Sequence, residues 1–258
     1  MKGDLWIAVG NDNWDAHPDQ FLSAALVTAK ISDWKSALTE NFKDQSIEQR
    51  MKQPLQNLPI RSVSNEYHVI DALNYFKAQS VRGLWTLDKM VKSNSQLARL
   101  KNELCANLGW LATHPQLITI GTYGKAEWLI NNLPHAQEGL GRAYGLLAAL
   151  ILPFLANQDC LLVVLDSDDG QLVLDYIHQS LGVWQRSKMA QHDCGKFIDL
   201  QQNYFEDTPL DKSALYSIAE MGAALVSLSQ NHEGEIRLHH PNQTWNNVKF
   251  FKFEELLP

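Results

Sequence analysis

Three aspartates in one short stretch, Asp166-Ser-Asp-Asp-Gly170, are the residues of this chain best suited to do chemistry. They follow residues 160–165, an uninterrupted apolar run typical of a central strand. Ligands of α/β sheets bind at the carboxyl ends of strands. The oxygens of Asp166, Asp168 and Asp169 could therefore hold Mg²⁺ or Mn²⁺ for glycosyl or phosphoryl transfer.

The same loop also has a purely structural interpretation. Asp168 or Asp169 would cap the helix that residues 170–181 predict, because a carboxylate satisfies free N–H groups and favours the helix dipole. Nearby basic residues that would hold a substrate phosphate are lacking. A phosphoryl-transfer site of Toprim type would also need an upstream glutamate, for which Glu127 is the candidate. The loop thus predicts either a metal site or a helix cap.

Histidines and cysteines elsewhere do not form a recognisable catalytic pattern. His192-Asp-Cys194 places a base, an acid and a nucleophile side by side, but a triad requires spatial geometry, so we expect a surface turn. His239 and His240, with His232 across a predicted hairpin, lack the matching ligands of a metal site. The cysteines Cys105, Cys160 and Cys194 show no disulfide spacing and are expected to be reduced thiols.

Composition limits the class of protein. The chain has 258 residues and a formal net charge of −7, which argues against nucleic acid or an anionic membrane as partner. The apolar residues 143–156 are too few to span a bilayer, and the N-terminus lacks the pattern of a signal peptide. We expect a cytoplasmic protein that forms one α/β domain over residues 1–258, with a polar surface connection at residues 44–65.

Alternating helical and strand patterns predict the elements of that domain. We expect a mixed central sheet with helices on both faces. The predicted strands are residues 5–9, 116–122, 160–166, 196–199, 223–229, 235–239 and 248–253, the last three forming a meander with a turn at residues 231–234. The predicted helices are residues 20–31, one starting at Ser32, 67–76, 87–111, 125–131, 136–155 and 170–181. Most of the eight tryptophans should anchor the core.

The stretch from Pro209 to residue 228 resembles the ketosynthases of the thiolase-like family. In that family a Pro-Phe-Asp motif precedes Gly-Glu-Gly-Ala and a core strand. Here Pro209 and Asp211 stand at the same distance from Gly222-Ala223, and Glu220-Met221 occupy the Gly-Glu positions. The resemblance covers about residues 116–240 and implies a half-length thiolase-like fold.

The resemblance also implies that the chain has no catalytic residue of its own. Residues 139–150 look like the family's nucleophile helix, where a cysteine at the helix start has a lowered thiol pKa. That place falls near Gly139, and neither Gln137 nor Glu138 can form a thioester. The histidines of the family's second half lie beyond this chain's matched part. Close packing of a helix on a sheet explains the same small residues without any such ancestry.

A ketosynthase-like chain without its cysteine resembles a chain-length factor. This resemblance implies a non-catalytic subunit, without cofactor or metal, that pairs with a true ketosynthase and its acyl carrier protein in fatty-acid or polyketide biosynthesis. Such a partner would make the protein a hetero-oligomer. Two alternatives stay open: the metal-dependent transferase that uses Asp166, Asp168 and Asp169, and a non-enzymatic interaction or immunity-type protein.

Overall fold

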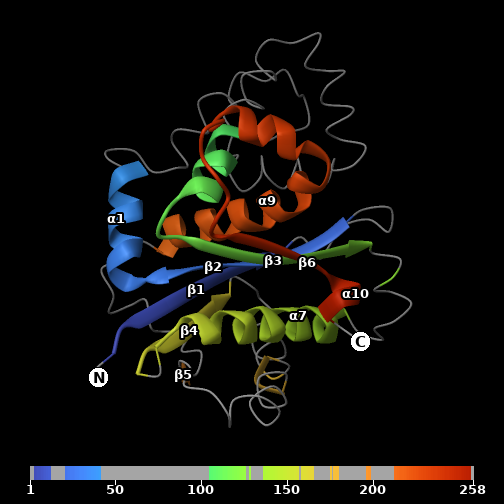
Figure 1. The fold of residues 1–258 in the computed structure, drawn as a ribbon. Coiled ribbons are helices and arrows are strands. Elements are labelled where there is room, and N and C mark those ends of the chain that lie inside the picture. The colour runs from blue at the N-terminus through green and yellow to red at the C-terminus, as the bar shows by residue number, and fades with distance from the viewer. Residues whose placement is uncertain are drawn as a thin grey trace, which may run out of the picture.

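The computed structural model describes residues 3–12, 21–41, 105–125, 128, 136–156, 158–165, 175, 177–179, 196–198 and 212–256. These residues form a six-stranded sheet with the strand order β5-β4-β1-β2-β3-β6. Helices lie on both faces of the sheet, with α7 below and α9 above in the view of Figure 1. The predicted α/β class with a mixed sheet is therefore confirmed.

The centre of the sheet is an antiparallel pair, β1 (Leu5–Asp12) and β2 (Phe21–Lys30), with Val9 opposite Val27. The strand predicted at residues 5–9 is confirmed and extends to Asp12. The helix predicted at residues 20–31 is wrong, because these residues form β2. This strand lies between β1 and β3 and is covered on both faces, so it shows no alternation of polar and apolar residues.

One face of the sheet is covered by α7 (Ala136–Ile151), which continues into the short helix η1 (Leu152–Phe154). Tyr144 and Leu147 pack here against Leu26 and other even-numbered residues of the central strands. The chain then enters β4 (Cys160–Leu165), which pairs in parallel with β1 and with the edge strand β5 (Lys196–Ile198). The predicted helix at 136–155 and the strands at 160–166 and 196–199 are confirmed in these positions.

The opposite face is covered by α9 (Lys212–Leu238), which lies across the sheet (Figure 1). The predicted strands at residues 223–229 and 235–239 and the turn at 231–234 are wrong, because all of these residues are helical. Residues 218–229 of this helix are buried wherever the structure describes them. A helix that is apolar on nearly every side lacks the one-sided hydrophobic pattern of a surface helix. Its sequence pattern is therefore similar to that of a buried strand.

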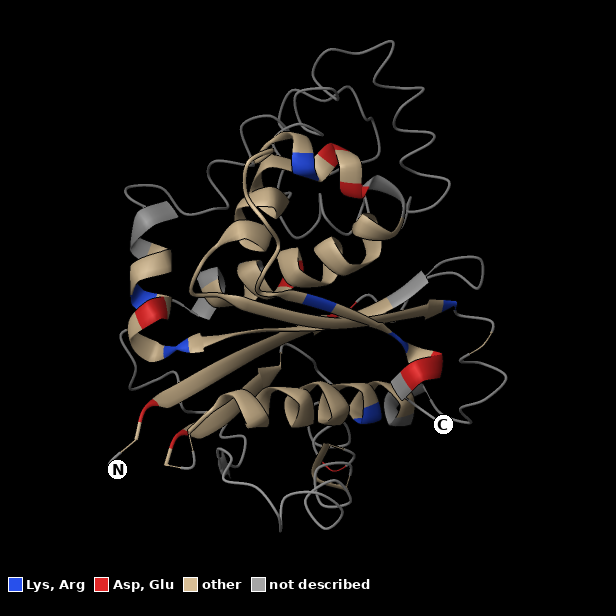
Figure 2. Ribbon diagram, in the orientation of Figure 1, with Lys and Arg blue, Asp and Glu red and all other residues tan. Residues whose placement is uncertain are grey.

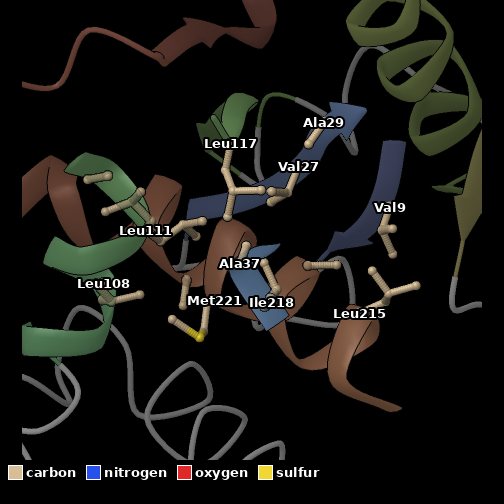
Figure 3. Packing of buried hydrophobic residues seen from close by; sticks show 14 of the residues in the cluster. Val9, Val27, Ala29, Ala37, Leu108, Leu111, Leu117, Leu215, Ile218 and Met221 are labelled. Carbon is tan, nitrogen blue, oxygen red and sulfur yellow. The ribbon is translucent and has the colours of Figure 1, made fainter. Parts of the chain in front are cut away.

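The core under α9 joins helix and sheet residues that are far apart in sequence (Figure 3). Val9 and Val27 of the sheet meet Leu215 and Ile218 of α9, and Trp34 lies in the same cluster. Trp34 belongs to α1 (Ile31–Asn41), the helix predicted to start near Ser32. Helical residues 105–113 close this layer through Leu108 and Leu111. This confirms the last part of the helix predicted at residues 87–111.

The other edge of the sheet is formed by β3 (Ile118–Lys125) and β6 (Val248–Lys252). The predicted strand at 248–253 exists, but it belongs to no meander, because it pairs in parallel with β3 and is reached through α9. The short helix α10 (Phe253–Leu256) follows it. The helices predicted at 67–76 and 125–131, the connection at 44–65 and most of residues 170–181 lie outside the described residues. The exceptions are Lys125, which ends β3, and Trp128, Asp175 and residues 177–179, which are helical.

At the amino edge of the sheet, Asp159 joins three segments. Its Oδ1 accepts a hydrogen bond from the backbone N–H of Asp4 at 2.9 Å, and its Oδ2 accepts from Trp6 Nε1 and from the Ala156 N–H, each at 3.2 Å. Partial burial acts to raise the pKa of Asp159, but these three hydrogen bonds and the charge of Lys30 outweigh it and lower that pKa below its ordinary value.

We therefore expect Asp159→Asn to lower the free energy of unfolding by about 1–3 kcal/mol at neutral pH, because three donors lose an anionic acceptor. Since the folded-state pKa is depressed, this stabilisation is present above the ordinary aspartate pKa of about 3.9 and is lost as the pH falls through the lower folded value. Urea unfolding of both proteins across this acid range should show the difference shrinking. An equal difference at every pH, or an equal loss in the exposed control Glu254→Gln, would contradict this role.

Candidate functional site

The carboxyl edge of the sheet is where the chain could best bind a ligand. β1, β3, β4, β5 and β6 all run in one direction, and β2 alone runs against them in the described sheet. After β1 the chain continues to β2 on one side, whereas β4 lies on the other side of β1. The connections that follow β1 and β4 therefore leave the sheet in opposite directions. In α/β sheets, ligands bind in the crevice between two such strand ends.

A carboxylate stands at this point. Asp12 is the last residue of β1 and lies two positions beyond Gly10, which is the register partner of Leu165 at the end of β4. Asp166 directly follows Leu165 in the sequence, but Asp166, Asp168 and Asp169 lie outside the described residues. The structure thus brings Asp12 to the strand end from which the predicted aspartate loop departs.

The carboxylate of Asp12 is oriented by α7. The hydroxyl of Tyr144 donates a hydrogen bond to Asp12 Oδ2 at 3.0 Å, and Tyr144 itself is only 1% exposed. Gly10 leaves room for this ring, since a Cβ at that position would lie 2.9 Å from Tyr144 Cε1 and 2.3 Å from Leu165 Cδ2. A glycine, a buried tyrosine and the end of β1 therefore fix one carboxylate oxygen in place.

The polar surroundings of Asp12 extend to the opposite face of the sheet. Asn11 precedes it in β1 and is 8% exposed, and Ser23 of β2 donates a hydrogen bond to the carbonyl oxygen of Ala223 in α9 at 3.2 Å. Polar side chains therefore lie at the described part of the carboxyl edge, and buried threonines such as Thr28 and Thr119 also lie further inside the sheet.

The histidines and cysteines are not brought together into a site. His232 lies within α9, so the hairpin that would have set it opposite His239 and His240 does not exist. Neither Cys105 nor Cys160 is in a disulfide. His192, Asp193, Cys194 and Glu127 lie outside the described residues. In the described part of the chain, no three His, Cys, Asp or Glu side chains are grouped as metal ligands.

The position at which the ketosynthase resemblance implies a nucleophile falls near Gly139, near the start of α7. Gly139 is buried, as are Ala143 and Tyr144 one turn further along. The helix therefore packs closely on the sheet here. Close packing of this kind explains the small residues without any relation to a ketosynthase. A strand, β4, follows this helix in sequence, in the order that the ketosynthase resemblance implies.

Asp12 is not among the site residues predicted from sequence, because it lies beyond the strand predicted at residues 5–9. The available signal was an aspartate directly after an apolar strand, the same signal that singled out Asp166. What the sequence could not supply was the strand order, because only pairing of β1 with β4 places the two strand ends side by side.

Comparison of the chain with protein-family models, curated proteins and solved structures gave no match. The family resemblance therefore rests on the quoted residues alone. Among the helices that the structure describes, none has the length and apolar character needed to cross a bilayer.

Proposed function

We propose that the chain binds a divalent cation at the carboxyl edge of its sheet and uses it for phosphoryl or glycosyl transfer. The observation that supports this proposal is the position of Asp12. It ends β1 beside the end of parallel strand β4, whose continuation in sequence is the Asp166-Ser-Asp-Asp loop. Carboxylates at the ends of two adjacent parallel strands can bind one hard cation together. If the aspartate loop served only to cap a helix, no carboxylate on a second strand would be needed.

The donor set fits such a cation in chemical type. Mg²⁺ and Mn²⁺ prefer oxygen ligands, and Asp12 supplies a carboxylate whose orientation is fixed by the Tyr144 hydroxyl. Asp166, Asp168 and Asp169 would complete the set. A bound cation would stabilise the negative charge that develops on a transferred phosphoryl group or on a nucleotide leaving group.

The direction of α7 favours a phosphate-bearing substrate. β3 ends at the carboxyl edge and β4 begins at the amino edge, so α7, which connects them, begins at the carboxyl edge. The first turn of a helix carries free N–H groups and a partial positive charge, which attract anions. Both phosphoryl donors and sugar nucleotides contain such an anion.

We expect Asp12→Asn to abolish stabilisation of the protein by Mn²⁺. A ligand at a hundredfold excess over its dissociation constant adds about 2.7 kcal/mol to the free energy of unfolding. Asparagine keeps the size of the side chain and an acceptor for Tyr144, so loss of the effect would report the lost charge. Unfolding temperatures with and without Mn²⁺ measure it, and Asp168→Ala should behave in the same way.

The matched control is Asp33→Asn, in the first turn of α1, because β2 ends and α1 begins at the opposite edge of the sheet. This variant should keep the full response to Mn²⁺. An equal response in the wild type, Asp12→Asn and Asp33→Asn would refute the proposed site, as would the absence of any response in the wild type.

The chain-length-factor-like partner subunit stays as a second proposal. The order of α7 and β4 supports it, since the resemblance implies a nucleophile helix followed by a strand. Against it stands the helix α9 at residues where the resemblance implies a core strand. Co-expression with a neighbouring ketosynthase and acyl carrier protein should yield a stable heterodimer under this proposal. A lone monomer that stays in solution without either partner would contradict it.

A further inference from the structure

The outer edge of β6 presents backbone groups that the sheet does not use. β6 is the last strand of the described sheet and pairs on one side with β3. The N–H of Thr119 donates to the carbonyl oxygen of Asn247 at 2.8 Å, which fixes the register. In a parallel ladder the backbone N–H and C=O groups of every second residue point to the same neighbouring strand. The backbone groups of Lys249 and Phe251 therefore point to β3. The N–H and C=O groups of Val248 and Phe250 therefore face outward.

The end of this open edge is closed by α10. The outward N–H of Lys252 donates to Glu255 Oε2 at 3.3 Å. This contact agrees with the register, because the backbone N–H of Lys252 points outward like those of Val248 and Phe250. Within the described part of the chain, two consecutive outward positions are thus left for a partner strand, and the third is already capped.

Basic residues lie in β6 and acidic residues in α10 directly after it (Figure 2). Lys249 is exposed, and its Nζ lies 4.5 Å from the ring centre of Phe154, which is itself 57% exposed. Phe250 is half-buried against the core under α9. Beside the start of the strand, the Arg237 guanidinium lies 4.2 Å from the ring centre of Trp245. An incoming strand would meet a lysine on one face of the sheet and apolar surface on the other.

We propose that β6 accepts an extended segment of a partner protein as a further strand, and that this segment alternates acidic and apolar side chains. Its backbone would pair with Val248 and Phe250. Its acidic side chains would lie on the face of Lys249, and its apolar side chains on the face of Phe250. This inference is independent of the cation site, which lies at the end of β1.

A second copy of the chain fits this edge less well. The open part of β6 carries Lys249 and no acidic residue, so two copies would bring two lysines to one seam. Lysines on an edge strand also discourage uncontrolled pairing. The same charge that repels a second β6 attracts an acidic segment, so the two effects favour one kind of partner.

The test uses the full chain and a short synthetic peptide that alternates Glu and Val, with a peptide of Lys and Val as control. The Glu peptide should bind and the Lys peptide should not. Lys249→Glu should weaken binding of the Glu peptide at least about tenfold, since an attractive cross-strand pair becomes repulsive, and should allow the Lys peptide to bind. Lys249 is exposed, so this variant should fold as the wild type does.

Amide hydrogen exchange supplies a second readout. Bound peptide should slow exchange at Phe250, whose N–H points outward, and change little at Phe251, whose N–H already faces β3. Failure of the Glu peptide to bind would overturn the proposal. It would also be overturned if Lys249→Glu bound both peptides as the wild type does, or if the protein alone formed a dimer that this variant abolished.

Discussion

Trp34→Ala should lower the free energy of unfolding by about 3–5 kcal/mol, the range for removing a large buried aromatic side chain. Trp34 is 0% exposed and belongs to the core cluster under α9. Its Nε1 also donates to the carbonyl oxygen of Ile7 in β1 at 2.9 Å, so the side chain connects α1 with the central strand. A loss of this size is a large part of the stability of an ordinary domain.

Chemical denaturation of three variants separates the contributions of Trp34. Trp34→Phe keeps most of the buried volume but loses the indole donor, and it should cost less than half as much as Trp34→Ala. Phe154→Ala removes an aromatic ring that is 57% exposed and should cost less than about 1 kcal/mol. A Trp34→Ala protein as stable as Phe154→Ala would show that α1 does not pack on β1 as described.

Gly121→Ala should lower the free energy of unfolding by about 1–3 kcal/mol, because it overpacks the contact between β3 and α9. A Cβ at Gly121 would lie 2.1 Å from Val226 Cγ2, and a Cβ at Gly222 would lie 2.6 Å from Val27 Cγ2. Both glycines therefore let α9 approach the sheet at distances that a methyl group excludes. Circular dichroism during urea unfolding measures the cost.

Two further variants test the helical assignment of α9. Gly234 has no atom within 4 Å of an added Cβ, so Gly234→Ala should stabilise the protein by about 0.5–1 kcal/mol as an ordinary helix substitution. Val226→Ala removes the atom that Gly121→Ala would strike, so the cost of Gly121→Ala should fall in the Val226→Ala background. Additive costs for this pair, together with destabilisation by Gly234→Ala, would indicate the hairpin expected from sequence in place of the helix.

The sequence predicts the elements whose local pattern agrees with their surroundings. Residues 160–165 are apolar without interruption and form a strand that other strands flank on both sides, and residues 136–151 have helical spacing and form α7. Residues 20–31 were predicted as a helix from an apolar helical pattern, but contacts from both neighbouring strands and both helical layers make them the strand β2.

α9 shows the converse error. Its glycine and alanine pair at Gly222-Ala223 was interpreted as the approach to a strand, whereas Gly222 serves to bring the helix against Val27. Apolar residues such as Leu225 and Val226 face different core clusters, so both sides of the helix are buried. When a segment has no polar face, its hydrophobic residues show neither helical nor strand periodicity. Whether it forms a helix or a strand then depends on tertiary packing, which the sequence does not reveal.

Half of the candidate site could be predicted. The Asp166-Asp169 loop was found because carboxylates after a buried strand are a local signal. Asp12 was not found, because its relevance depends on the parallel pairing of β1 with β4 across about 150 residues of sequence. The contact between Asp12 and Tyr144 depends in turn on how α7 packs on β1. Gly10 makes room for the Tyr144 ring, but a single glycine in the sequence does not predict this packing.

Direct titration with Mn²⁺, followed by electron paramagnetic resonance of the free ion, tests the central claim about the carboxyl edge of the sheet. We predict that the wild-type chain and Asp33→Asn remove Mn²⁺ from solution to the same stoichiometric extent and that Asp12→Asn does not. Equal uptake by all three proteins, or no uptake by the wild type, would contradict a cation site built on Asp12.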